Sequence, residues 1–198
     1  MTYSRLTRLL ADQPLCGRIV ELHVLSAENY KELAASCLDP EVWRSTIAKI
    51  STVEQLQEYL DRAMEQWVEG SAVPLLIRLV EDGTAVGSTR LAISYEQDVL
   101  EIGWTFLAPA YHRRGVNAEA KLLLLQYSFE VLGCSKVIFK VASGNERSKA
   151  ALTKLGAVPF VPNHVSDAVG ETAIEWFEIL VANWPTHRRE LETRLQRT

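Results

Sequence analysis

A short stretch of mixed charge, YHRRGVNAEAK at residues 111–121, is the part of the sequence best suited to chemistry. Arg113 and Arg114 bring positive charge, and Gly115 lets the backbone approach a ligand closely. The apolar run that follows predicts a helix over 117–132, and the first N–H groups of a helix favour an anion because they have no internal partner. We therefore expect this loop to bind a small anion, and a diphosphate suits the combination.

Two common nucleotide-binding patterns are missing from this loop. No Gly-Lys-Ser/Thr follows the glycine, so it is not a Walker loop, and no GxGxxG is present, so it is not a dinucleotide fingerprint. Nucleotide hydrolysis and NAD chemistry therefore lose their usual support.

Composition restricts the class of protein further. The 198 residues suit one domain, and no apolar run reaches the roughly 18 residues that a membrane helix needs. The first residues have too short an apolar stretch for a secretory signal, so we expect a cytoplasmic protein that does not bind a membrane. A net charge of −4 gives no broad basic surface, which argues against a nucleic-acid partner.

The cysteines and histidines show no metal-ligand spacing. Three widely separated cysteines favour neither a disulfide framework nor a CxxC site, and the four histidines are equally scattered. We therefore expect no metal and no structural disulfide.

Hydrophobic periodicity predicts an α/β domain around the loop. We expect strands over 16–25, 75–80, 85–94, 99–107, 136–142 and 171–180. We expect helices from Ser26, from 51 to Gly70, over 117–132 and 145–155, and after Pro185. The second helix is the best marked, because Ser51 and Glu54 have capping-box spacing. The loop would thus lie between an antiparallel meander and a βαβα half.

The order of these elements resembles that of the GCN5-related N-acetyltransferase (GNAT) family. The pieces that carry the resemblance are EIGWTFLAP at 101–109, GVNAEAKLLLL at 115–125 and NERSKAALTKLGA at 145–157. The sequence is most similar to the branch that acetylates the amino termini of ribosomal proteins. The resemblance implies a single α/β domain over 16–184 with a mixed, mostly antiparallel central sheet flanked by helices. It also implies a splayed strand pair that holds the cofactor, an N-terminal extension over 1–15 and a C-terminal helix over 185–198.

The activity implied by this resemblance is direct transfer of an acetyl group from acetyl-CoA to a primary amine. The acceptor could be a protein N-terminus or a small amine, and the sequence does not choose between them. The alternative is a non-catalytic acyl-CoA-binding or regulatory module of the same fold. The chain could also form a homodimer.

Several residues are implied in binding acetyl-CoA. They are the loop and helix-start residues His112, Arg113, Arg114, Gly115, Val116, Asn117 and Ala118, the strand residues Phe106 and Leu107 through their backbones, and Asn145 and Ser148. His112 departs from the family's usual Gln or Arg, which leaves its contact with the diphosphate open. Asn117 and Asn145 could also serve simply as helix N-caps.

Glu101 and Ser148 are the candidate catalytic residues. Most amines are protonated at neutral pH, so a base is needed, and Glu101 interrupts an apolar strand where the thioester is expected. Its alternative role is a paired or solvated strand-end carboxylate. Ser148 could donate to the CoA sulfur, or could bond the carbonyl of Gly144. Leu152 stands where many relatives have a tyrosine, which excludes a tyrosine proton donor there.

The tryptophans and Cys134 are expected to be structural. We expect Trp43, Trp67 and Trp104 in the core, with a role for Trp104 on the acceptor side as the alternative. Cys134 is expected to be a core or loop thiol, because direct transfer needs no acyl-cysteine.

Overall fold

A twisted sheet of nine strands forms the centre of the computed structural model, which describes residues 13–44, 46–94, 96–162, 168–169 and 172–197. The strand order is β1-β2-β3-β4-β5-β6-β9-β7, and β8 pairs with β9. The strands are β1 (Leu15–Cys16), β2 (Val20–Val24), β3 (Ala72–Leu79), β4 (Ala85–Ile93), β5 (Val99–Leu107), β6 (Lys136–Ala142), β7 (Val158–Phe160), β8 (Ala168–Val169) and β9 (Thr172–Leu180).

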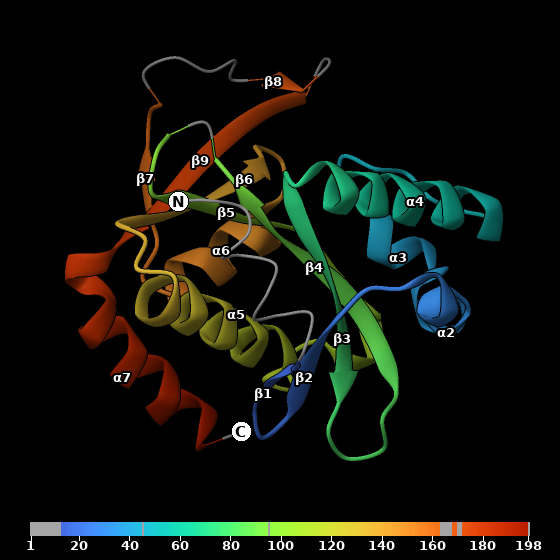
Figure 1. The fold of residues 1–198 in the computed structure, drawn as a ribbon, viewed down its shortest axis with the longest axis horizontal. Helices are drawn as coiled ribbons and strands as arrows, with labels where there is room; N and C mark the ends of the chain where they lie inside the picture. Colours follow the sequence, from blue (N-terminus) through green and yellow to red (C-terminus); the bar gives the residue numbers. More distant parts are fainter. Residues whose placement is uncertain (1–12, 45, 95, 163–167, 170–171, 198) are drawn as a thin grey trace.

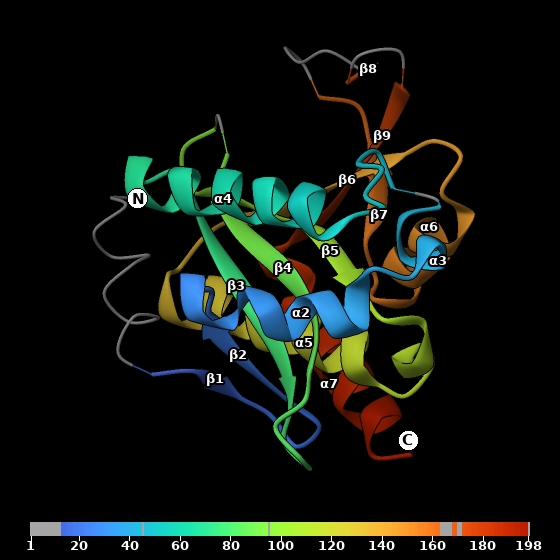
Figure 2. The ribbon, with the colours of Figure 1, turned by 90° about the vertical axis from the view of Figure 1, so that its right-hand side faces the viewer.

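Helices cover both faces of this sheet. They are α2 (Tyr30–Cys37), α3 (Pro40–Trp43), α4 (Val53–Glu69), α5 (Val116–Gln126), α6 (Glu146–Lys154) and α7 (Trp184–Leu195). Figures 1 and 2 show α2, α3 and α4 on one face of the central strands and α5 with α7 on the other. The α/β architecture and the mixed, mostly antiparallel sheet are therefore confirmed.

The pairing of β5 with β6 is the one parallel pair among the described strands. It covers three residue pairs and ends at Glu101 opposite Ile138. Beyond this point β5 continues to Leu107 and β6 to Ala142 without pairing with each other, so the two strands splay as predicted. The α5 helix makes the crossover that parallel neighbours require.

Most predicted elements are present, with differences at their ends. The predicted strand over 16–25 is divided into β1 and β2 by a turn after Cys16. Ser26 does not cap α2, which begins at Tyr30 after a 3-10 turn. The expected helix over 117–132 is α5 followed by a π-helical turn, Tyr127–Val131. The short elements α3, β7 and β8 were not predicted.

The cap of α4 is shifted by one residue from the predicted box. Thr52 is the N-cap, and its hydroxyl accepts from the N–H of Gln55 at 3.2 Å. The side chain of Gln55 in turn accepts from the N–H of Ser51 at 2.8 Å. At the other end, Gly70 adopts the left-handed conformation with a φ of 81°, so the predicted stop is confirmed.

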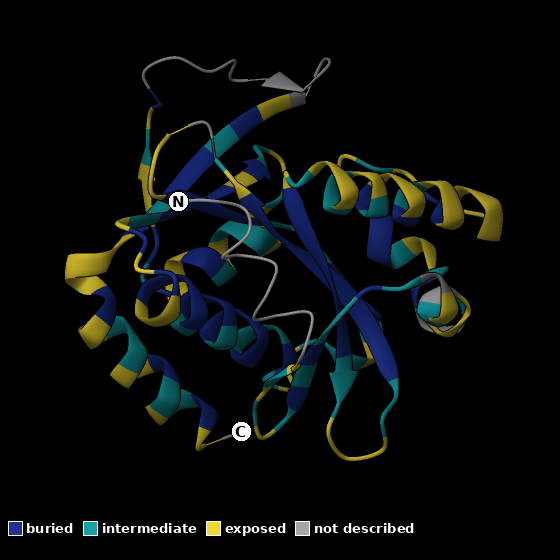
Figure 3. Cartoon of the chain, in the orientation of Figure 1, coloured by how far each residue is buried: buried dark blue, intermediate teal, exposed yellow. Residues whose placement is uncertain are grey.

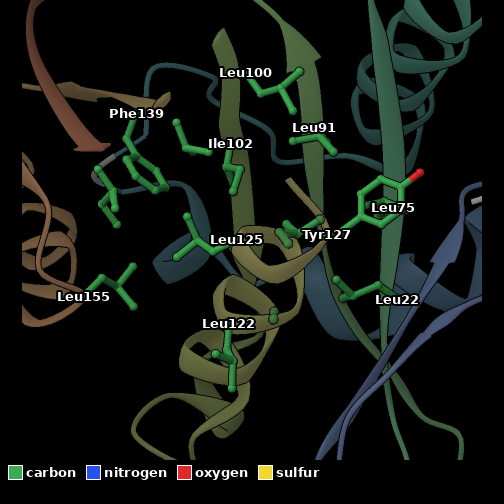
Figure 4. Close-up of a cluster of buried hydrophobic side chains, with 14 of the residues drawn as sticks. Leu22, Leu75, Leu91, Leu100, Ile102, Leu122, Leu125, Tyr127, Phe139 and Leu155 are labelled. Carbon is green, nitrogen blue, oxygen red and sulfur yellow. The ribbon is translucent and has the colours of Figure 1, made fainter. Parts of the chain in front are cut away.

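The largest core cluster lies between the sheet and α5. Figure 4 shows Ile102 of β5 close to Leu125 of α5, and Leu75, Leu91 and Leu100 belong to the same cluster. A second cluster joins α2, α3 and α4 to the opposite face. Figure 3 shows that exposed residues lie on the outer sides of α4 and α7. Helices therefore cover both faces of the central strands and hold these strands in place.

A buried carboxylate ties α5 to the turn between β1 and β2. Glu119 accepts hydrogen bonds from the N–H groups of Arg18, Ile19 and Val20 at 3.0, 2.6 and 2.7 Å. A side chain at Gly17 would place its Cβ 2.5 Å from an oxygen of this carboxylate. A side chain at residue 17 would therefore displace the Glu119 carboxylate from its present position against this turn.

The C-terminal helix α7 packs against α5 and the π-helical turn. The indole N–H of Trp184 donates to the Glu130 carboxylate at 2.7 Å, and Arg188 pairs with the same carboxylate at 3.0 Å. Leu191 and Leu195 are buried in the main core cluster. The tail helix expected after Pro185 is thus present and docked. Most of the N-terminal extension over 1–15 lies outside the described residues.

We expect Glu119→Ala to lower the free energy of unfolding by about 3 kcal/mol or more, because three backbone donors lose a charged acceptor. Urea unfolding measures this loss. Glu58→Ala, on the exposed face of α4, is the control and should change stability by less than about 0.5 kcal/mol. Equal effects of the two changes would contradict an anchoring role for Glu119.

Candidate active site

A β-bulge distorts β5 just before its free end. Ser88 of β4 lies opposite Phe106, and Arg90 lies opposite Gly103, so two steps on β4 match three steps on β5. Trp104, within this segment, has a φ of 51°, a left-handed value that is strained for a bulky residue. The backbone is therefore irregular at the place where the thioester is expected.

The three tryptophans singled out in the sequence have different environments. Trp43 is buried, and Trp67 is partly buried against the main core cluster, so both are structural as expected. The side chain of Trp104 is 38% exposed, so the expectation that it belongs to the core was wrong. The strained bulge turns this residue outward.

The bulge and the splay determine where the backbone donors of β5 point. The N–H of Ala108 donates to Val86 of β4 at 2.9 Å. Because successive residues of a strand direct their N–H groups to opposite edges, Phe106 also faces β4, whereas Leu107 faces the edge that β6 has left. The side chains of Thr105 and Leu107 both lie on the α5 face, so we infer the same direction for the N–H of Thr105. The geometry favours Leu107 over Phe106 as a backbone contact and adds Thr105. Alternation counted back from Leu107 could have revealed Thr105 in the sequence.

The side chain of Phe106 has a structural environment. Its ring lies 4.7 Å from that of Trp43 and 5.9 Å from that of Tyr59, measured between centroids. These aromatic residues fill the space between β5 and the helices α3 and α4. Phe106 therefore fixes this part of β5 against the α4 face.

The anion loop has the backbone conformation that its sequence predicts. Arg113 and Gly115 have φ values of 63° and 79°, and Gly115 is the N-cap of α5. Asn117 lies inside the helix, so the alternative that Asn117 is the N-cap is wrong. The N–H of Glu119 already donates to Gly115 at 2.8 Å. The helix-start donors without an intrahelical acceptor are consequently those of Val116, Asn117 and Ala118.

The side chains of this loop divide into exposed and enclosed groups. Arg113 and Arg114 are exposed, and the Arg114 guanidinium lies 5.8 Å from the centre of the Tyr111 ring. The amide oxygen of Asn117 is buried and accepts no hydrogen bond from any described residue. Since a buried acceptor without a donor is costly, this oxygen marks a place where a ligand could donate.

His112 connects the end of β5 to the start of α6. Its Nε2 lies 3.2 Å from the carbonyl oxygen of Leu107, and its Nδ1 lies 3.5 Å from the Arg147 guanidinium. Since a carbonyl can only accept, Nε2 carries the proton and Nδ1 is free to accept. Burial and then the nearby Arg147 lower the pKa of His112, which favours this neutral form. Its ring is thus engaged by the protein itself.

Glu101 lies where the pairing of β5 and β6 ends, on the sheet face opposite α5. It is 6% exposed, and its carboxylate pairs with Lys140 of β6 at 2.8 Å. Burial raises the pKa of Glu101, and the hydrogen bond and charge of Lys140 partly offset that rise. A Cβ at Gly103 would lie 3.2 Å from the Glu101 carboxylate, which therefore extends along β5 toward the bulge. The carboxylate is paired, as its alternative role requires, but it is not solvated.

The start of α6 lies close to the end of β5, because Arg147 contacts His112, which in turn contacts Leu107. Asn145 is the N-cap, and its side-chain oxygen accepts from the N–H of Ser148 at 3.1 Å. The Ser148 hydroxyl is half-buried and makes no hydrogen bond to Gly144 or to any other described residue. Leu152, one turn further, is buried in the core. Ser148 therefore has a hydroxyl that remains available to a ligand.

The metal-ligand types and the two buried thiols give no second candidate centre within the described residues. No group of three or more His, Cys, Asp or Glu side chains there could hold a metal ion. Burial raises the pKa of Cys37 and of Cys134 to about 12, so neither thiol ionises readily. None of the described helices is both long and apolar enough to cross a membrane.

Comparison with known proteins identifies the fold. A family model described as an acetyltransferase (GNAT) domain matches residues 20–158. A solved structure from T. thermophilus, assigned as an acetyltransferase, is 31% identical with a TM-score of 0.77 and covers 92% of this chain and 97% of its own.

More distant structures share the fold. A GCN5-related N-acetyltransferase from Brucella melitensis superposes with a TM-score of 0.81 at 23% identity, covering 92% of this chain and 85% of its own. A Vibrio cholerae protein assigned as a ribosomal-protein-serine acetyltransferase has a TM-score of 0.73 at 18% identity, covering 86% and 98%. At these identities the likeness concerns the fold alone.

We expect Lys140→Met to raise the pKa of Glu101 further, because the change removes the hydrogen bond and the charge that oppose burial. A pH titration of the Glu101 side-chain carboxyl by ¹³C NMR measures the shift. Lys149→Met, which removes a lysine paired instead with Glu146 and Glu175, is the control and should leave the Glu101 titration unchanged. A Glu101 pKa that fails to rise in Lys140→Met would contradict the coupling.

Proposed function

This chain belongs to the GNAT acetyltransferase family, and on that premise we propose that it transfers acetyl from acetyl-CoA directly to a primary amine. The observation that carries this proposal is the splay of β5 from β6 immediately after Glu101. The splay leaves backbone donors on one edge of β5 and a carboxylate at the point of divergence. A thioester and an amine acceptor need groups of these two kinds close together.

The loop before α5 is suited to the diphosphate of acetyl-CoA. The unpaired N–H groups of Val116, Asn117 and Ala118 would donate to phosphate oxygens, and the exposed Arg113 and Arg114 would add charge. His112 would act indirectly, because its ring already holds Leu107 and faces Arg147.

The edge of β5 is suited to the pantetheine arm and the thioester. Acetyl-CoA, when bound, supplies an acetyl group that an amine nitrogen can attack directly. The N–H of Thr105 would donate to the carbonyl oxygen, where negative charge develops, and the N–H of Leu107 would hold the arm. Asn145 caps α6, so it would position the start of this helix beside the pantetheine arm, which its backbone would contact.

Glu101 would remove the proton that most amines carry at neutral pH. Its carboxylate would accept a proton from the acceptor nitrogen directly or through one water, and Lys140 favours the ionised form of the carboxylate. The hydroxyl of Ser148 would donate to the leaving sulfur as its negative charge grows. The raised pKa of Cys134 argues against an acyl-cysteine intermediate.

The acceptor would approach from the α4 side of the sheet, where Trp104 is exposed next to the bulge. Protein amino termini and small amines both fit a face of this kind. The sequence-based expectation of a cytoplasmic location is part of this proposal. A purified wild-type protein that transfers labelled acetyl from acetyl-CoA to any member of an amine and peptide panel would exclude the non-catalytic binding module.

We expect Gly115→Val to weaken acetyl-CoA binding at least tenfold, about 1.4 kcal/mol, because valine strains the left-handed turn and crowds the diphosphate. Calorimetry on folded protein measures the affinity. Gly83→Val is the matched control, since Gly83 has a similar φ of 73° in the β3–β4 hairpin with open space around it. Equal affinity in the two variants would show that the loop does not bind the diphosphate.

We expect Glu101→Gln to lower kcat/KM by about 100-fold near neutral pH, with partial recovery at high pH where more of the amine is unprotonated. Steady-state kinetics across pH 6 to 10 test this. Lys140→Met breaks the same ion pair but keeps the carboxylate and raises its pKa, so its loss of activity should be confined to the low-pH side of the profile. An equal loss in both variants would assign Glu101 a structural role.

A further inference from the structure

A lysine lies buried beneath the bulge and has no part in the proposed chemistry. Lys121, on α5, is 5% exposed, and its Nζ donates to Thr105 at 2.6 Å and to Thr89 at 3.3 Å. The two threonine hydroxyls lie 2.8 Å apart. Together these side chains form a polar cluster, Lys121–Thr89–Thr105, inside an otherwise apolar interface between α5 and the sheet.

Burying this lysine opposes its charge. Desolvation lowers the pKa of Lys121 to about 7, and the partners within reach are hydroxyl groups rather than carboxylates. Glu119, two residues earlier on α5, is engaged by the turn between β1 and β2. An apolar side chain would fill this position at lower cost, so the amine is expected to have a specific task.

The cluster surrounds the residues that form the bulge. The hydroxyls of Thr89 and Thr105 lie 3.3 and 3.4 Å from the carbonyl oxygen of Gly103, the residue immediately before Trp104. Thr89 belongs to β4 and Thr105 to β5, so Lys121 bonds both strands across the irregular step. The side chain of Thr105 is thereby held toward α5, while its N–H faces the edge that β6 has left.

We propose that Lys121 is a positioning residue, which fixes the bulge through Thr89 and Thr105 so that the Thr105 N–H points at the thioester carbonyl. This inference rests on the proposed function, because it assumes that acetyl-CoA occupies the splayed edge. Lys121 itself touches no substrate. Its amine acts through the threonine whose backbone is the donor.

The test compares variants that remove one member of the cluster with variants that keep it. Lys121→Met and Thr105→Val delete a hydrogen-bonding group while preserving size, and Thr105→Ser keeps the hydroxyl. We expect the first two to lower kcat about tenfold or more with acetyl-CoA affinity changed less than about threefold. Thr105→Ser, which restores the hydroxyl, should recover most of the kcat that Thr105→Val loses. Since both deletions remove the hydrogen bond between Lys121 and Thr105, the double variant should lose little more kcat than either single variant.

A spectroscopic readout reports the same geometry without an acceptor. Acetyl-CoA labelled with ¹³C at the thioester carbonyl should show a lower stretching frequency when bound to the wild-type protein, because the Thr105 N–H polarises the carbonyl. The shift should shrink in Lys121→Met and persist in Thr105→Ser. Ser128→Ala, which removes a buried hydroxyl bonded to Leu124 further along the chain, is the control and should keep the full shift.

The outcomes separate this inference from the function beneath it. An unchanged carbonyl shift and kcat in Lys121→Met, with wild-type binding and turnover intact, would overturn the positioning role and leave the proposed function standing. A wild-type protein that binds no acetyl-CoA would overturn both. Loss of thermal stability in Lys121→Met without any change in kcat would assign the lysine to packing.

Discussion

Beyond Glu101 the backbone of β5 stays paired with β4 but no longer with β6, and the site is a consequence of that separation. β6 pairs with β9 over its whole length, and β5 follows β4 through the bulge, so β5 and β6 separate after Glu101. Strand donors normally find acceptors in a neighbouring strand. Here the fold leaves such donors along an edge that lies between two well-packed faces. A ligand with carbonyl oxygens can supply what the missing strand pairing does not.

Three of the buried charged groups, Glu119, Glu101 and Lys121, are compensated in different ways, and the differences match different tasks. Glu119 is satisfied by main-chain donors and joins α5 to the first turn of the sheet. Glu101 is balanced by the partly exposed Lys140, so its charge can still respond to an incoming proton. Lys121 has only hydroxyl partners, and its role is local geometry.

Features that are determined by residues close in sequence were predicted well, whereas features that are determined by residues close only in space were not. The bounds of β5 and β6 and the left-handed stop at Gly70 follow from local alternation and glycine chemistry. The loop glycine and the splay were likewise expected, the latter through family resemblance. The bulge, the Lys140 partner of Glu101 and the three donors on Glu119 could not be predicted, because each depends on residues from separate strands or helices. Trp104 was misplaced for the same reason.

The single extra residue in β5 also shifts the alternation of its side chains, so that odd-numbered residues after the bulge face the side that even-numbered residues face before it. Before the bulge, Leu100 and Ile102 point to the α5 side, whereas after it Leu107 and Thr105 do so and Phe106 joins the aromatic cluster on the other face. Ser88 and Arg90 share one face of β4, and the bulge lets Phe106 and Gly103 lie opposite them although these two residues are three positions apart. Loss of one residue here would restore a regular ladder and leave Phe106 on its present face. The extra residue therefore leaves the packing of both faces unchanged and alters only the local path of the backbone at Trp104.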